Sequence, residues 1–97
     1  MDKHIYEFLK ILKFDDSEIN LLKDIAPTLN ETSSQIIIDN ISLVVDAGYP
    51  ADDLTFLISQ NPAFLCRNTL ELKSDIEKLL NSNEDLETLL KNNPDLI

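Results

Sequence analysis

The chain has 97 residues, of which 43% are hydrophobic and 27% are charged, so it is too short for two domains of ordinary size. With one glycine, no tryptophan and 6% aromatic residues, it has few of the turn residues that a β-sandwich or barrel needs, which excludes an all-β fold. Its formal charge of −10 repels polyanions.

Residues 1–13 contain the first predicted helix. Phe8, Ile11 and Leu12 have the i, i+3, i+4 spacing of one helix face, and His4 falls on the same face one turn earlier. We expect this helix to match the second helix of a two-helix unit that recurs further along the chain. Residues 1–13 are therefore interpreted as half a unit.

Proline marks three copies of a first helical pattern. Pro27, Pro62 and Pro94 lie 35 and 32 residues apart, and each follows a segment that starts acidic and becomes apolar. Because proline disfavours helical geometry in the residue before it, a helix is expected to stop beside each proline. The apolar residues share one helix face and comprise Leu54, Leu57 and Ile58 in the middle copy and Leu86, Leu89 and Leu90 in the last.

The first copy departs from this pattern at one position. Lys23 stands where the other copies have their third apolar residue, and Leu21 and Ile25 are expected to supply the missing apolar area. Asp15, followed by Glu18 three residues later, has the spacing of a capping box and predicts where this helix begins.

A second helical pattern follows the first two prolines, and its apolar residues repeat at i, i+4, i+7 and i+8. The β-branched residues of 36–45 leave a strand as the alternative there, but the match to 70–81 favours a helix. Gly48 suits the end of the earlier helix. The apolar residues are Ile37, Ile41, Val44 and Val45 in one copy and Leu72, Ile76, Leu79 and Leu80 in the other, and the expected capping pairs are Thr32 with Gln35 and Asn68 with Glu71. Ser82 with Asp85 is the expected capping pair of the helix before Pro94.

This order predicts one all-α domain over residues 1–97. It comprises a half unit at 1–13, full units at 14–47 and 48–81, and a closing half unit at 82–97. About six helices would form a right- or left-handed stack of antiparallel pairs, because one amphipathic pair cannot bury its apolar face alone. The residues expected to define the repeat are Pro27, Pro62, Pro94, Leu54, Leu57, Leu86, Leu89, Ile41, Ile76 and Leu79.

Residues 48–65 read Gly-Tyr-Pro-Ala-Asp-Asp-Leu-Thr-Phe-Leu-Ile-Ser-Gln-Asn-Pro-Ala-Phe-Leu and are followed by Thr69 and the second apolar pattern. This segment resembles a motif of the mitochondrial transcription termination factor (mTERF) family. Residues 84–97 resemble the start of another copy, and 15–45 resemble a weaker one. The resemblance implies a curved α-solenoid with a short 3₁₀ turn after each proline, and nucleic-acid binding in its groove.

The charge of this chain differs from that of a nucleic-acid-binding solenoid, which needs several clustered cations. Arg67, Lys73 and Lys78 form the least acidic stretch beyond residue 13 and are the candidate contact for a polyanion. A solvated helix face is the alternative, because acidic residues are interleaved with these cations.

Groups that could carry catalysis or bind a metal have simpler explanations. The acidic pairs 15–16, 52–53 and 84–85 stand at predicted helix starts, where carboxylates cap helices and favour the helix dipole. His4 has no second ligand beside it, and Cys66 lies in an apolar run typical of a reduced core thiol. We expect no enzyme activity, no metal and no cofactor.

Four aromatic residues are expected to fill the core between units, although exposed aromatics could instead mark an interface. They are Phe14, Tyr49, Phe56 and Phe64.

These features predict a non-catalytic interaction module that binds a protein with a basic surface, because acidic charge attracts such partners. Nucleic-acid binding of the mTERF type, connected with transcription, is the alternative. Homodimerisation through an apolar edge at the C-terminal half unit is also open. A single cysteine, no leader pattern and no long apolar stretch favour a cytoplasmic protein without a membrane segment.

Overall fold

The computed structural model describes residues 3–25 and 31–97, apart from the side chains of Lys23 and Ile25, and all regular structure in these ranges is helical. The prediction of an all-α fold is therefore confirmed, and the strand alternative for 36–45 is wrong. Pro27 lies outside the described residues. The α-helices are α1 (Lys3–Ile11), α2 (Asp16–Ile25), α3 (Ser34–Asp46), α4 (Leu54–Gln60), α5 (Thr69–Leu80) and α6 (Leu86–Asn92), and the 3₁₀ helices are η2 (Ala51–Asp53), η3 (Pro62–Cys66) and η4 (Pro94–Leu96).

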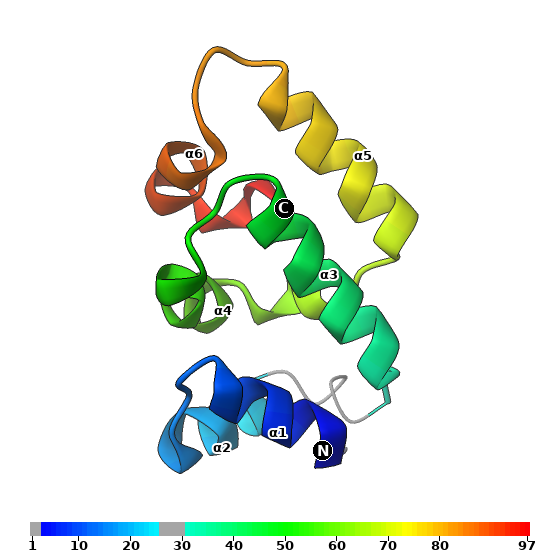
Figure 1. Cartoon of the computed structure of the whole chain (residues 1–97), viewed down its shortest axis with the longest axis vertical. Coiled ribbons are helices and arrows are strands. Elements are labelled where there is room, and N and C mark those ends of the chain that lie inside the picture. Colours follow the sequence, from blue (N-terminus) through cyan, green and yellow to red (C-terminus); the bar gives the residue numbers. More distant parts are fainter. Residues whose placement is uncertain (1–2, 26–30) are drawn as a thin grey trace.

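The helices lie on two sides of an elongated molecule of 38 × 23 × 20 Å. Helices α3 and α5 run beside each other along one side, whereas α4 and α6 lie on the other (Figure 1). Helix α1 contacts α3, η3 packs between α3 and α4, and η4 contacts α4. The 3₁₀ helices that begin at Pro62 and Pro94 thus each contact two α-helices.

The core contains most of the residues expected to define the repeat. Leu54, Leu57, Leu86, Ile41 and Ile76 are buried, and the helix-ending residues Asn61 and Asn93 stand directly before the two prolines. Leu79 and Leu89 are half-buried, whereas Leu80, expected on the same face as Leu79, is exposed.

Helix α1 buries a face that only partly overlaps the predicted one. Phe8 and Leu12 of the predicted face are half-buried against the core, but Ile11 is 76% exposed, and the fully buried residues are Ile5 and Leu9. His4 also lies on the exposed side. The sequence match to Ile76 and the leucines after it assigns His4 and Ile11 to the buried face, whereas the structure buries Ile5 and Leu9 instead.

The first copy of the pattern also differs from its prediction at one residue. Leu21 is 54% exposed and supplies no core area, whereas Ile19 and Leu22 are buried. Ile19 and Leu22 each stand 35 residues before a buried leucine of α4, so the repeat spacing identifies the core face better than local apolar content does.

Two of the predicted caps are confirmed and two are wrong. Asp15 Oδ1 accepts from the Glu18 N–H at 2.8 Å while Glu18 Oε1 accepts from the Asp15 N–H at 3.3 Å, and Asn68 Oδ1 accepts from the Leu70 and Glu71 N–H groups. The cap of α3 is Ser33 rather than Thr32, and that of α6 is Asp85 rather than Ser82. Each helix begins directly after its cap, a position that a three-residue spacing alone does not locate.

Gly48 ends α3 with a left-handed backbone at φ +112°. Its N–H donates to the Val45 carbonyl, and the Tyr49 N–H donates to the Val44 carbonyl, which is the Schellman pattern of helix termination. The predicted helix end is therefore confirmed.

Lys13 ends α1 with the same hydrogen-bond pattern and a φ of +73°. Its N–H donates to the Lys10 carbonyl and the Phe14 N–H donates to the Leu9 carbonyl. Phe14 is buried like Tyr49, so both turns place an aromatic ring in the core. Of the four aromatics expected there, Phe64 is also buried, but Phe56 is 42% exposed.

Candidate functional site

Asn40 is a fully buried polar side chain on α3. Its Nδ2 donates to the carbonyls of Phe64, Leu65 and Arg67 at 2.9–3.1 Å, and its Oδ1 accepts from the Thr69 hydroxyl at 2.9 Å. We call these five residues the Asn40 junction. It fastens α3 to η3 and to the start of α5, and it leaves no polar atom of the buried amide unsatisfied.

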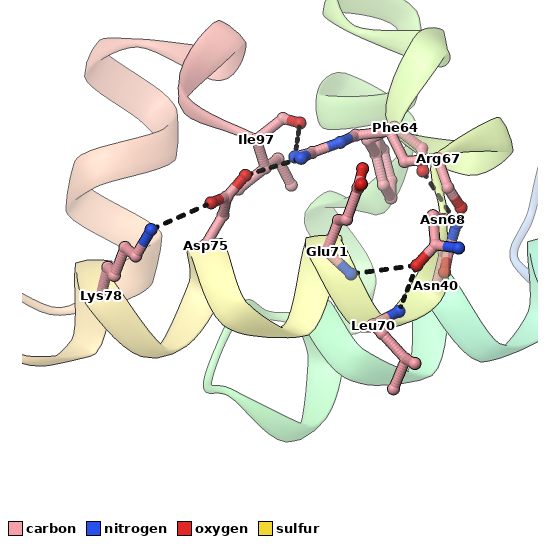
Figure 2. Close-up of polar contacts among 9 residues, drawn as sticks. All are labelled: Asn40, Phe64, Arg67, Asn68, Leu70, Glu71, Asp75, Lys78 and Ile97. Carbon is pink, nitrogen blue, oxygen red and sulfur yellow. Dashed lines mark hydrogen bonds and ion pairs between the residues drawn. The ribbon is translucent and has the colours of Figure 1, made fainter.

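Arg67 makes a second junction toward the C-terminal unit (Figure 2). Its Nη1 donates to the Ile97 carbonyl at 2.6 Å and its Nη2 donates to Asp75 Oδ2 at 2.6 Å. We call Arg67, Asp75 and Ile97 the Arg67 bridge. The hydrogen bond from Arg67 lowers the pKa of Asp75, and Lys78 Nζ adds a weaker contact to that carboxylate at 3.9 Å.

Both junctions use the same position of successive helices, because Asp75 stands 35 residues after Asn40. An asparagine amide can donate to a carbonyl directly, but an ionised carboxylate can only accept. Asp75 therefore cannot bond to the Ile97 carbonyl directly. Arg67 lies between the two and donates a hydrogen bond to each. The arginine thus has a structural task that its sequence neighbours did not reveal.

The structure does not gather Arg67, Lys73 and Lys78 as three available cations. The Arg67 side chain is 27% exposed and bound to Asp75, which Lys78 also contacts. Lys73 is exposed on α5, and no carboxylate lies within ion-pair distance of it in the described ranges.

The remaining described cations also lie beside carboxylates. Lys3 pairs with Glu7, Lys10 with Asp16 and Lys13 with Asp52. The hydrogen bonds that Lys91 donates to Glu87 and then to Asp53 raise the pKa of Lys91. Several exposed carboxylates have no cation at ion-pair distance among the residues with described side chains. These are Asp24, Glu31, Asp46, Glu71, Glu77, Glu84 and Asp95.

Tyr6, Lys10 and Asp16 form a surface cluster outside these junctions. The Tyr6 hydroxyl donates to Asp16 Oδ1 at 2.5 Å, and Lys10 Nζ lies 2.8 Å from the same oxygen. The hydrogen bond to Asp16 raises the pKa of Tyr6, and Lys10 is the main cause of the lowered pKa of Asp16. These exposed contacts join α1 to α2.

The acidic pairs at helix starts have capping and ion-pair contacts. Asp15 and Asp85 accept hydrogen bonds from backbone N–H groups of the helices they precede, and Asp53 pairs with Lys91. Among the described residues no group of three His, Cys, Asp or Glu side chains could hold a metal ion, and no pocket opens. Cys66 is half-buried against the core, and His4 is exposed on α1.

No family model, curated protein or solved structure matches the chain. The resemblance to mTERF repeats therefore stays a prediction, and function is argued from the geometry of the described residues. None of the helices in the described ranges is long and apolar enough to cross a membrane.

Sequence reasoning missed Asn40 and Asp75, although a signal was present. Asn40 interrupts the apolar face of α3 between Ile37 and Ile41, and the repeat spacing leads from it to another polar residue on α5. A polar residue at the same position of two successive apolar helix faces indicates that each side chain has a hydrogen-bonding partner on a neighbouring element.

Proposed function

We propose that this protein is a non-catalytic interaction module in which two-helix units stack as a short mTERF-like α-solenoid. Its partner is a protein with a basic surface. The stack is supported by the Asn40 junction and the Arg67 bridge, which connect each unit to the next through equivalent helix positions. The proposed location is the cytoplasm, where Cys66 would stay reduced.

The observation that carries the proposal is the distribution of charge among the described residues. All of the described lysine and arginine side chains, Lys73 excepted, have a carboxylate of this chain within ion-pair distance, while several exposed carboxylates have no lysine or arginine at that distance among the described side chains. A surface of this kind attracts cationic partners and disfavours phosphates.

Nucleic-acid binding of the mTERF type is the competing hypothesis, and the Arg67 bridge argues against it. Arg67 would have to leave both Asp75 and Ile97 before it could contact a phosphate, and Lys78 would have to leave Asp75. Binding to a polyanion normally requires several free cations at once.

The test compares fluorescently labelled probes by anisotropy at about 50 mM salt, where exposed charges are weakly screened. The probes are a Lys/Arg-rich peptide, a Glu-rich peptide of equal length, duplex DNA and single-stranded RNA. We expect binding of the basic peptide that weakens as salt is raised, and no binding of the other three. Nucleic-acid binding that is lost in the Arg67→Glu/Lys73→Glu variant would overturn the proposal in favour of the mTERF-type function.

A further inference from the structure

Two exposed apolar side chains occupy equivalent positions on the first helices of successive units. Leu21 on α2 and Phe56 on α4 are 35 residues apart, which is the repeat spacing in this part of the chain. Their helix neighbours Leu22 and Leu57 are buried. These two helices therefore each direct one apolar side chain outward, while their other apolar side chains that the structure describes pack inward.

The helices that carry these side chains lie on the same side of the molecule. Lys13, just before α2, lies 3.7 Å from Asp52 of η2, which leads directly into α4. At the other edge of α4, Asn61 Nδ2 donates to the Pro94 carbonyl at 2.9 Å. Helices α2, α4 and α6 accordingly follow one another along one side of the molecule (Figure 1).

Carboxylates flank the two apolar side chains at distances of one helical turn. Asp24 stands three residues after Leu21 on α2 and so lies beside it on the helix surface. Asp52 stands in η2, four residues before Phe56, and is exposed like Asp24. Glu84 stands two residues before α6, as Asp52 stands two residues before α4. Asp52 has the Lys13 contact, in which both side chains are more than four-fifths exposed, so this contact is weak.

We propose that the face formed by Leu21, Asp24, Asp52, Phe56 and Glu84 docks a basic amphipathic helix of a partner protein. This inference rests on the proposed function and specifies the segment that would be bound. Residues seven positions apart on one helix are separated by about 10.5 Å. A helix docked across α2 and α4 would place two such apolar residues against Leu21 and Phe56 while its lysines and arginines face the carboxylates.

Charge complementarity selects this occupant over the alternatives. A second copy of this chain would bring the same carboxylates against one another in a twofold contact, which is unfavourable. An anionic membrane or a nucleic acid would meet the same repulsion.

The experiment measures binding of a labelled peptide of about 15 residues that has leucines at i and i+7 flanked by lysine and arginine. A second peptide has the same composition with the leucines dispersed around the helix. The test variant is Leu21→Ser/Phe56→Ser, and the control is Ile11→Ser/Leu70→Ser, which removes two exposed apolar side chains outside the face. We expect the test variant to bind the first peptide about tenfold more weakly and the control to bind it like the wild type.

Circular dichroism and thermal unfolding check that both variants fold. If the double variant does not, Phe56→Thr replaces it, because Thr88 occupies the equivalent position of α6.

Three results would overturn the docking face. Equal affinity of the wild type and the test variant for the first peptide would leave the proposed function intact and exclude this face. A wild-type dimer in sedimentation that becomes monomeric in the test variant would identify a second copy as the occupant. Failure of both basic peptides to bind at low salt would remove the proposed function together with the inference.

Discussion

Asn40 and Asp75 show how one side chain position can be used with two chemistries. The Asn40 amide donates directly to carbonyls of η3, whereas Asp75 binds Arg67 and leaves the guanidinium to donate to Ile97. The first solution is neutral and buried, and the second is ionic and partly exposed. We therefore expect the two junctions to respond differently to substitution and to pH.

Replacing Asn40 by alanine should lower the free energy of unfolding by at least about 1–3 kcal/mol, because three carbonyls and the Thr69 hydroxyl would lose a buried partner. Urea unfolding measures the change. Asn92→Ala, at an exposed position near the end of α6, is the matched control and should change stability by less than about 0.5 kcal/mol. Similar losses in both variants would show that the Asn40 junction contributes little.

The Asp75→Asn variant should change how stability depends on pH. Because Arg67 lowers the folded pKa of Asp75, the carboxylate stabilises the fold above its unfolded pKa of about 3.9, and this contribution disappears as pH falls through the lower folded value. The variant should therefore be less stable than the wild type near neutral pH, and the difference should shrink in acid. Urea unfolding of both proteins near neutral pH and in acid measures this difference in stability. Glu77→Gln on the same helix is the control and should show no such convergence.

Lys13→Gly should raise the free energy of unfolding by about 0.5–1 kcal/mol, since a lysine at φ +73° has a strained left-handed backbone that glycine adopts freely. Lys73→Gly, in the middle of α5, should instead lower it by about 1 kcal/mol. Thermal unfolding distinguishes the two. Destabilisation of both variants by similar amounts would mean that the backbone at Lys13 carries no strain.

At the scale of the element, burial of one helix face is the main stabilising feature. Leu57→Ala on α4 should cost about 2–5 kcal/mol, because the side chain is completely buried. Leu79→Ala should lower the free energy of unfolding by less, because Leu79 is half-buried. Leu70→Ala should lower it by under about 0.5 kcal/mol, because that side chain is 77% exposed. Chemical denaturation measures all three. Equal losses at Leu57 and Leu70 would contradict the assignment of helix faces.

The sequence predicted α3 and α5 well because their apolar residues recur over three turns, and prolines located the ends of α4 and α6. It failed where a single residue decides the outcome. The left-handed turn at Lys13 follows α1, and a lysine gives no signal for that conformation.

The interaction surface was less predictable than the helices. Phe56 has the large apolar side chain that is typical of a core residue, yet it is exposed because its position between the buried Leu54 and Leu57 directs it outward. Arg67 has the side chain expected of a phosphate contact, yet it donates a hydrogen bond to the carboxylate of Asp75, eight residues later. Both outcomes depend on which face of a helix meets a neighbouring unit, which local composition does not encode.

At the scale of the whole molecule, repulsion among carboxylates opposes folding. With a formal charge of −10, the midpoint of thermal unfolding should rise as sodium chloride is increased from about 20 mM to about 0.5 M, because the screening length falls from about 20 Å to about 4 Å. The longest dimension is 38 Å, so at low salt the repulsion extends across much of the molecule. A midpoint that falls with salt would mean that the ion pairs outweigh the repulsion.

The junctions also bear on how such a chain could lengthen. In each case the side chain that donates to a backbone carbonyl belongs to the earlier segment: Asn40 lies within 14–47, and Arg67 lies within 48–81. A backbone carbonyl is an acceptor that every amino acid provides, and Thr69 is the only side chain of the later segment that the Asn40 junction uses among the described residues. Duplication of such a segment within a gene would thus carry these donors with it.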